Sequence, residues 1–161
     1  MNEQLAISAA ARAAIVAHAE AIYPNECVGL LLGALENGHK RAVAAQPVEN
    51  RWAGQVTLSD NDDATSQRDR FYLDPHDYLA ADRAARTQGL DVIGCYHSHP
   101  NWPAEPSERD RVGAQALGGS GFSFLIQRVD DGQARELRSW LLSIDGQIFS
   151  EELINFDAST D

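Results

Sequence analysis

Runs of apolar residues, many of them β-branched, mark three stretches of the chain as buried strands. They cover residues 26–35, 90–99 and 122–126. The first is apolar on both faces in its middle, which is typical of a central strand. Residues 39–48 and 136–144 place apolar residues at alternate positions and are predicted to be their neighbours in a sheet.

Three further segments carry the signals of helices. Apolar residues at helical spacing predict one over residues 8–22, and an aspartate cap, a proline at the first position and a final glycine predict one over residues 74–89. A third is expected from Ser107 to about Leu117. Hairpin turns are indicated at Asn37-Gly38, Asp131-Gly132 and Asp145-Gly146. This order predicts an α/β protein with a mixed β-sheet flanked by helices.

The interval before the second helix is the least regular part of the chain. Residues 55–58 are weakly strand-like, residues 59–69 are polar without periodicity, and residues 71–73 are expected to form a short strand. Two interpretations of residues 59–69 remain open. The segment is either a solvated connection or an insertion that contacts substrate.

Length and charge limit the function classes. A chain of 161 residues is expected to form a single domain, residues 1–161. Its formal net charge of −11 argues against nucleic acid and anionic membranes as partners, because both attract basic surfaces. Two cysteines, Cys27 and Cys95, lie inside apolar strand patterns, which favours a reducing cytoplasm over a disulfide scaffold. The first residues lack the features of a signal peptide.

The predicted strand over residues 90–99 ends in a pair of histidines. Side chains two apart on a strand share a face, so His97 and His99 can aim both imidazoles at one point. Pro100 lacks the N–H that a strand ladder needs and is expected to end the strand. A proline-rich loop then leads to Ser107 and Asp110 at the start of a helix.

Two neutral imidazoles and one carboxylate form a three-ligand zinc site with an open fourth position, the arrangement used for hydrolysis. A plainer interpretation exists for the same residues. His97 and His99 would be hydrogen-bonded strand residues, and Ser107 with Asp110 would form a helix capping box. The cap and the metal site are compatible, because a helix start is a rigid place to hold a ligand.

The spacing of these residues resembles a known signature. His97-Ser98-His99, seven residues, Ser107, two residues and Asp110 match the motif of the JAMM/MPN+ zinc metalloproteases, a family of isopeptidases. That family also has an upstream strand of the form Glu-x-x-Gly-x-Leu-x-Gly, which matches Glu26 to Gly33 here. The resemblance extends from Glu26 to the C-terminal strands and is to the prokaryotic stand-alone form.

The resemblance implies a fold, a cofactor and roles. The fold is a curved sheet flanked by helices, similar to cytidine deaminases. One Zn²⁺ per chain is held by His97, His99 and Asp110. Glu26 is the general base, and Ser107 donates to the oxyanion of the tetrahedral intermediate.

Residues around the signature have competing interpretations. Ser98 faces away from the histidines and is expected to be structural, while Glu105 and Glu108 look like solvated carboxylates. Trp102 either packs the loop or lines a substrate groove. Cys95 shares a strand face with the first histidine, but a buried small apolar residue is favoured over a nucleophile because nothing stabilises a thiolate.

The expected function is hydrolysis of the peptide or isopeptide bond after the C-terminal glycines of a ubiquitin-like or sulfur-carrier protein. Some prokaryotic stand-alone members of the family remove cysteine from a sulfur-carrier protein. A non-catalytic scaffold is the first alternative, disfavoured by the complete set of motif residues. A zinc deaminase is the second, disfavoured because its Pro-Cys-x-x-Cys element is absent. The sequence leaves the oligomeric state open, a dimer included.

Overall fold

The structure is a computed structural model that describes residues 4–52, 67–68, 70–117 and 121–157. The weakly strand-like residues 55–58 and most of the polar segment 59–69 lie outside these ranges. Whether that segment is a connection or a substrate-contacting insertion therefore stays a prediction.

Within the described residues, helices and strands follow the predicted order, except that one strand is added at the start and the predicted strand over residues 71–73 is absent. Their bounds are β1 (Gln4–Ile7), α1 (Ala9–Ile22), β2 (Val28–Glu36), β3 (His39–Val48), α2 (Pro75–Arg86), β4 (Asp91–Pro100), α3 (Glu108–Ala114), β5 (Ser123–Asp130), β6 (Gln133–Leu142) and β7 (Phe149–Phe156).

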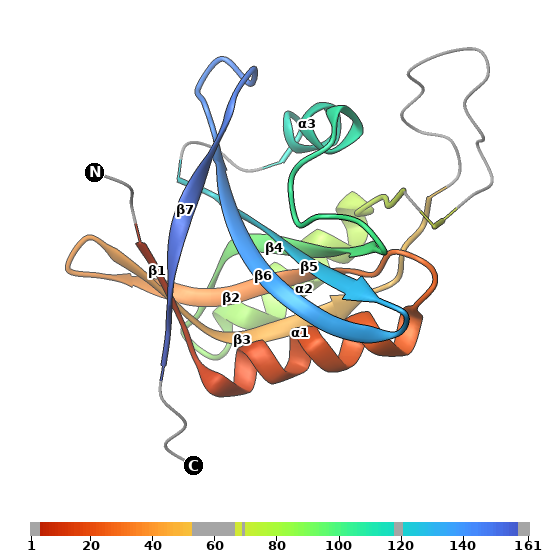
Figure 1. Cartoon of the computed structure of the whole chain (residues 1–161). Coiled ribbons are helices and arrows are strands. Elements are labelled where there is room, and N and C mark those ends of the chain that lie inside the picture. The colour runs from red at the N-terminus through yellow and green to blue at the C-terminus, as the bar shows by residue number, and fades with distance from the viewer. Residues whose placement is uncertain (1–3, 53–66, 69, 118–120, 158–161) are drawn as a thin grey trace.

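The strands close into a barrel in the order β1-β3-β2-β4-β5-β6-β7 (Figure 1). β4 and β5 are parallel, and β1 is parallel to both β3 and β7; the other neighbours are antiparallel. The predicted α/β class and mixed curved sheet are confirmed. The sheet curves so far that its edge strands pair and close it into a barrel. The sequence analysis does not predict β1, because four residues are too few to show a period and its partners lie far along the chain.

The predicted strand over residues 71–73 is wrong. The Tyr72 N–H donates to the side chain of Asn50, and the Tyr72 carbonyl accepts from the Arg51 N–H. The backbone there is paired with the end of another loop instead of a strand, so a short apolar run alone is a weak strand signal.

Several predicted element ends also differ, among them those of β4 and α3. β4 includes Pro100 as its last residue, because a proline at a strand end removes one donor without interrupting the ladder before it. The following N–H, that of Asn101, donates to Val129 and continues the pairing with β5. α3 ends at Ala114, earlier than Leu117.

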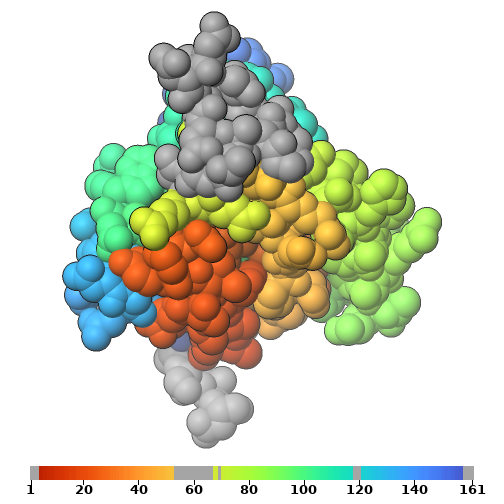
Figure 2. Space-filling model, turned by 90° about the vertical axis from the view of Figure 1, so that its right-hand side faces the viewer, coloured from red at the N-terminus to blue at the C-terminus, as the bar shows by residue number. Residues whose placement is uncertain are grey.

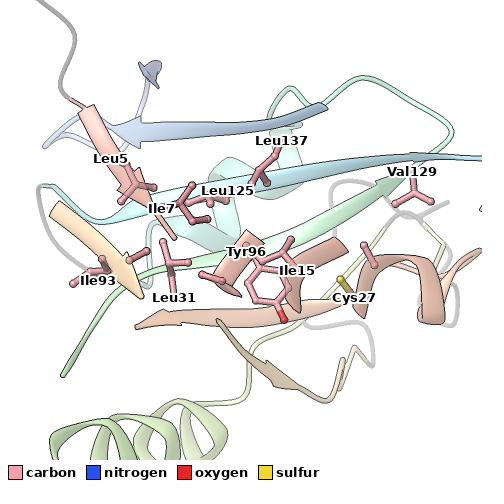
Figure 3. Close-up of a cluster of buried hydrophobic side chains, with 13 residues drawn as sticks. Leu5, Ile7, Ile15, Cys27, Leu31, Ile93, Tyr96, Leu125, Val129 and Leu137 are labelled. Carbon is pink, nitrogen blue, oxygen red and sulfur yellow. The ribbon is translucent and has the colours of Figure 1, made fainter. Parts of the chain in front are cut away.

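Each face of the sheet carries an apolar cluster. The cluster on the α1 side includes Leu5, Ile15, Leu31, Tyr96 and Leu125 (Figure 3). The cluster under α2 and α3 includes Val28, Leu30, Ala85, Cys95 and Phe124. Since neighbouring residues of a strand face opposite ways, the histidines two and four residues after Cys95 lie on the side of α2 and α3.

A buried ion pair spans the barrel between β3 and β7, the two strands that β1 joins. Lys40 Nζ lies 2.6 Å from Glu152 Oε2, and both side chains are buried. The Ser123 and Ser139 hydroxyls donate to Glu152 Oε1 at 2.7 and 2.8 Å. A buried pair of this kind depends on hydrogen bonds that satisfy its remaining polar atoms. Four strands are therefore joined through one carboxylate.

We expect Lys40→Met to lower the free energy of unfolding by about 3 kcal/mol, because it leaves the Glu152 carboxylate buried without its cation. Urea denaturation measures the change. The control is Arg86→Ala, which removes an exposed pair with Asp82 and should cost about 0.5 kcal/mol or less. Equal losses for the two variants would contradict a stabilising role for the buried pair.

No helix of the described residues is long and apolar enough to cross a membrane.

Candidate metal centre

The structure brings three predicted ligands together from two elements. His97 and His99 lie on β4, and Asp110 lies in the first turn of α3. The two Nε2 atoms are 3.1 Å apart, and Asp110 Oδ2 lies 3.3 Å from His97 Nε2 and 3.0 Å from His99 Nε2. Tetrahedral ligands about 2.0–2.1 Å from a zinc ion would be separated by about 3.3 Å. The spacing of the three atoms fits such an ion.

The orientation of His99 favours a cation between these atoms. His99 Nδ1 lies 2.8 Å from the Pro103 carbonyl, which can only accept, so Nδ1 carries the hydrogen. In the neutral ring Nε2 is then an acceptor, and it faces the Asp110 carboxylate, another acceptor. A proton can bridge two of the three converging atoms, whereas a metal ion can serve all three. The donor set therefore fits a metal, with Pro103 fixing the tautomer.

Each imidazole is stacked on an aromatic ring. Phe71 lies 4.3 Å from His97, and Trp102 lies 4.1 Å from His99 between ring centroids, both nearly parallel. Of the two interpretations of Trp102, packing of the loop against the site is the one that the contact supports. Trp140 Nε1–H donates to the Ala104 carbonyl and fastens the same loop to β6. The histidines are held by packing as well as by hydrogen bonds.

Asp110 is fixed by the helix start that it belongs to. The Asp110 N–H donates to Ser107 Oγ at 3.0 Å, and the Ser107 N–H donates to Asp110 Oδ2 at 2.9 Å, which completes a capping box. The predicted cap and the predicted ligand group thus coexist. The Ser107 hydroxyl hydrogen is not used in either bond.

The protonation states suit metal binding. Burial lowers the pKa of His97, against the opposing attraction of Asp110. Burial raises the pKa of Asp110, but attraction and hydrogen bonds from His97 and His99 outweigh it, so this pKa lies below its ordinary value. A neutral imidazole and an ionised carboxylate are the forms that bind metal without first releasing a proton.

Glu26 lies just before β2 and is almost completely buried, at 1% exposure. In the register of β2 and β4, Val28 is opposite His97, and Cys27 exchanges hydrogen bonds with Ser98. Glu26 itself lies outside the ladder, two residues before Val28. It therefore precedes the end of β2 that pairs with the histidine end of β4.

Packing explains why the Glu-x-x-Gly pattern has a glycine at position 29. A Cβ on Gly29 would lie 2.2 Å from ring atoms of Tyr96, the residue opposite it on β4. Only glycine leaves room for the buried Tyr96 ring while β2 stays against β4. This close approach keeps the two strands in the register that carries the site.

The remaining candidates lie outside the ligand group. Ser98 Oγ accepts from the Cys27 N–H at 2.8 Å, a structural role on the opposite face. Burial raises the pKa of Cys95 to about 12, so its thiol stays protonated and is no nucleophile. Glu105 and Glu108 are exposed and pair with arginines, Arg138 and Arg111.

A narrow, mainly apolar pocket opens beside two of the ligands. Its walls include Phe71, Pro106, Phe124 and Phe149 together with His97 and Asp110. Sequence reasoning does not find Phe71 or Pro103 as parts of this site. Phe71 precedes the motif by many residues, and Pro103 contributes only its carbonyl, which every residue type has.

Comparison with known proteins agrees with this geometry. A family model described as prokaryotic homologs of the JAB domain matches residues 8–143. The chain belongs to this JAB/MPN family. Among its relatives is a desampylase of Haloferax volcanii, 30% identical over 133 residues that make up 80% of this chain and 84% of the relative.

Solved structures of similar fold extend the comparison. A protein of Desulfitobacterium hafniense has a TM-score of 0.75 and 28% identity, with 96% of this chain and 94% of that one covered. A JAB1/MPN domain protein from Archaeoglobus fulgidus has a TM-score of 0.52 and 17% identity, covering 92% and 96%. The second likeness concerns the fold alone, and it is the JAB1/MPN fold.

We expect the JAB-family site to bind about one divalent ion per chain. Inductively coupled plasma mass spectrometry of the purified protein measures the content. His99→Ala should lose most of the metal, because Nε2 is one of three converging ligand atoms. His39→Ala, which changes an exposed histidine at the β2–β3 turn, should keep it. Undiminished metal in His99→Ala would contradict the ligand assignment.

Proposed function

We propose that this JAB-family protein is a zinc-dependent peptidase or isopeptidase. Its target is the bond after the C-terminal glycines of a ubiquitin-like or sulfur-carrier protein. The observation that carries the proposal is the convergence of His97, His99 and Asp110 on one point, with Nδ1 of His99 held by Pro103. The similarity to a desampylase supports a ubiquitin-like modifier as the substrate.

The three ligands are proposed to hold one Zn²⁺ per chain. When bound there, zinc lowers the pKa of a water molecule and polarises the carbonyl that the water attacks. Asp110 supplies the negative charge of the ligand set, and the capping box keeps its Oδ2 aimed at the two imidazoles. The stacked rings of Phe71 and Trp102 exclude solvent from the histidine faces.

Glu26 is the proposed general base. It accepts a proton from the attacking water and delivers this proton to the leaving amine. The burial of Glu26 supports this role, because a buried carboxylate is costly unless it is paired or used. Ser107 is the proposed oxyanion donor, and the hydrogen that its capping bonds leave unused supports that assignment.

The alternatives have less support. A non-catalytic scaffold would not need three buried ligands together with a buried carboxylate. A zinc deaminase on a similar fold would need its cysteine ligands, yet Cys27 and Cys95 lie in the two opposite apolar clusters. Both cysteines are free and buried, which supports the proposed cytoplasmic setting.

The deciding experiment is a cleavage assay read by mass spectrometry. Ubiquitin-like and sulfur-carrier proteins of the same cell, extended beyond their terminal glycines, are incubated with the protein. We expect cutting directly after the glycines, abolished by a zinc chelator and restored by zinc. Glu26→Gln should lower kcat at least about 100-fold while metal content is unchanged. Turnover by Glu26→Gln at the original rate would overturn the assigned base.

A second variant pair separates the two roles of Ser107. We expect Ser107→Gly to lower kcat by about 100-fold or more, because it removes a hydroxyl donor. Glycine is a tolerated N-cap and should cost only a few tenths of a kcal/mol in stability. Ser107→Thr retains both the hydroxyl and the cap and should recover most of the activity. If glycine and threonine are equally active, the hydroxyl is not the oxyanion donor.

A further inference from the structure

The backbone of Glu26 lies outside the β2 ladder and is held by a different set of bonds. β2 begins at Val28, so no strand partner pairs the Glu26 amide and carbonyl. The Glu26 N–H donates to the Gln67 carbonyl at 2.7 Å, and the Glu26 carbonyl accepts from Asn50 Nδ2 at 3.0 Å. Buried backbone groups need such partners, and here a side chain supplies one of them.

Asn50 uses its full hydrogen-bonding capacity. Nδ2 donates to the carbonyls of Glu26 and Arg70 at 3.0 and 2.9 Å. Oδ1 accepts from the N–H groups of Trp52 and Tyr72 at 3.1 and 3.0 Å. Two carbonyls on one side and two N–H groups on the other fix which amide atom is nitrogen. No other residue type of this size presents two donors and two acceptors in that arrangement.

These four bonds join three segments that are distant in sequence. They are Glu26 before β2, the chain after β3 and residues 70–72. Figure 2 shows the yellow-green segment that contains residues 70–72 lying across the border between red-orange and orange parts of the surface. Phe71 sits between the two residues that Asn50 binds in that segment, and its ring stacks on His97. One amide thus fixes both the proposed base and an aromatic wall of the ligand group.

We propose that Asn50 is a positioning residue for catalysis, one that sets the place of Glu26 relative to the ligands. The inference rests on the proposed function, because it gives Asn50 a role only through the proposed base. Among the described residues, the side-chain hydrogen bonds of Asn50 go to Glu26, Trp52, Arg70 and Tyr72 and to none of the three ligands. Its loss should therefore affect proton transfer and leave metal binding intact.

The sharpest variant is Asn50→Asp. It is isosteric and keeps the two acceptor bonds to Trp52 and Tyr72, but it replaces Nδ2 by an oxygen that faces the Glu26 and Arg70 carbonyls. Small displacements of a catalytic group are costly, so kcat should fall about 10- to 100-fold. KM and metal content should stay near their original values. Asn50→Ala, which removes all four bonds, should lose at least as much.

The matched control is Gln127→Ala. Gln127 is a buried amide whose Nε2 donates to the carbonyls of Arg128, Arg135 and Glu136, all in the β5–β6 hairpin. Its removal should lower stability with little change in kcat, measured well below the unfolding temperature. If Gln127→Ala and Asn50→Asp lose stability and kcat in the same proportion, Asn50 is structural only and the inference is overturned.

A double-mutant cycle tests whether Asn50 acts through Glu26. In a Glu26→Gln background, Asn50→Asp should change the remaining kcat less than about 2-fold, because the group that it positions is already disabled. An equal loss in both backgrounds would overturn the inference while leaving the proposed function standing. Full activity of Glu26→Gln alone would overturn the base assignment and the inference together. Should Asn50→Asp fail to fold, Asn50→Ser, which keeps one donor, replaces it in the same cycle.

Discussion

The contact between His99 Nε2 and Asp110 Oδ2 is the constraint on which the site depends. With its Nδ1–H directed to the Pro103 carbonyl, a neutral His99 presents the acceptor Nε2 to a carboxylate oxygen 3.0 Å away, an arrangement that a metal ion between the two atoms would stabilise. β4, the loop after it and the start of α3 must therefore keep their relative positions for the group to exist. The loop bond of Trp140 and the capping box supply that rigidity from outside the ligand set.

Closure of the barrel also helps to keep the ligand group in place, through strand pairings outside the site. β4 lies between β2, which follows Glu26, and β5, and both pairings are fixed along their length. The close approach of Gly29 to Tyr96 favours the observed register of β2 on β4, and a slip by one residue would turn the side chains of β2 to the other face. The buried pair of Lys40 and Glu152, with the hydroxyls of Ser123 and Ser139, joins β3, β5, β6 and β7. The geometry of the ligand group and the stability of the barrel are thus held by different residues.

Much of this arrangement can be read from the sequence. Strands over 26–35 and 90–99 follow from their apolar runs, and spacing alone brings His97 and His99 onto one face. The sequence does not show β1, which forms only because β3 and β7 offer it two parallel edges. The sequence also predicts a strand over residues 71–73 that does not form. This apolar run instead stacks the Phe71 ring on His97 and makes loop hydrogen bonds. A contribution made by a backbone carbonyl, such as that of Pro103, cannot be predicted from the residue type, because every residue has this group.

The local sequence pattern is enough to identify Glu26 as a candidate catalytic residue. It is not enough to explain how the structure holds Glu26 in place. A glutamate at the edge of an apolar run is unusual because burial penalises its charge, and that penalty is visible in the sequence. The bonds that fix its backbone come from Asn50 and Gln67, which lie 24 and 41 residues later in the chain. Those bonds depend on the path of the chain between β3 and α2. The position of Glu26, the proposed base, therefore depends on the path of this connection. The pairing of β2 with β4 alone does not determine it.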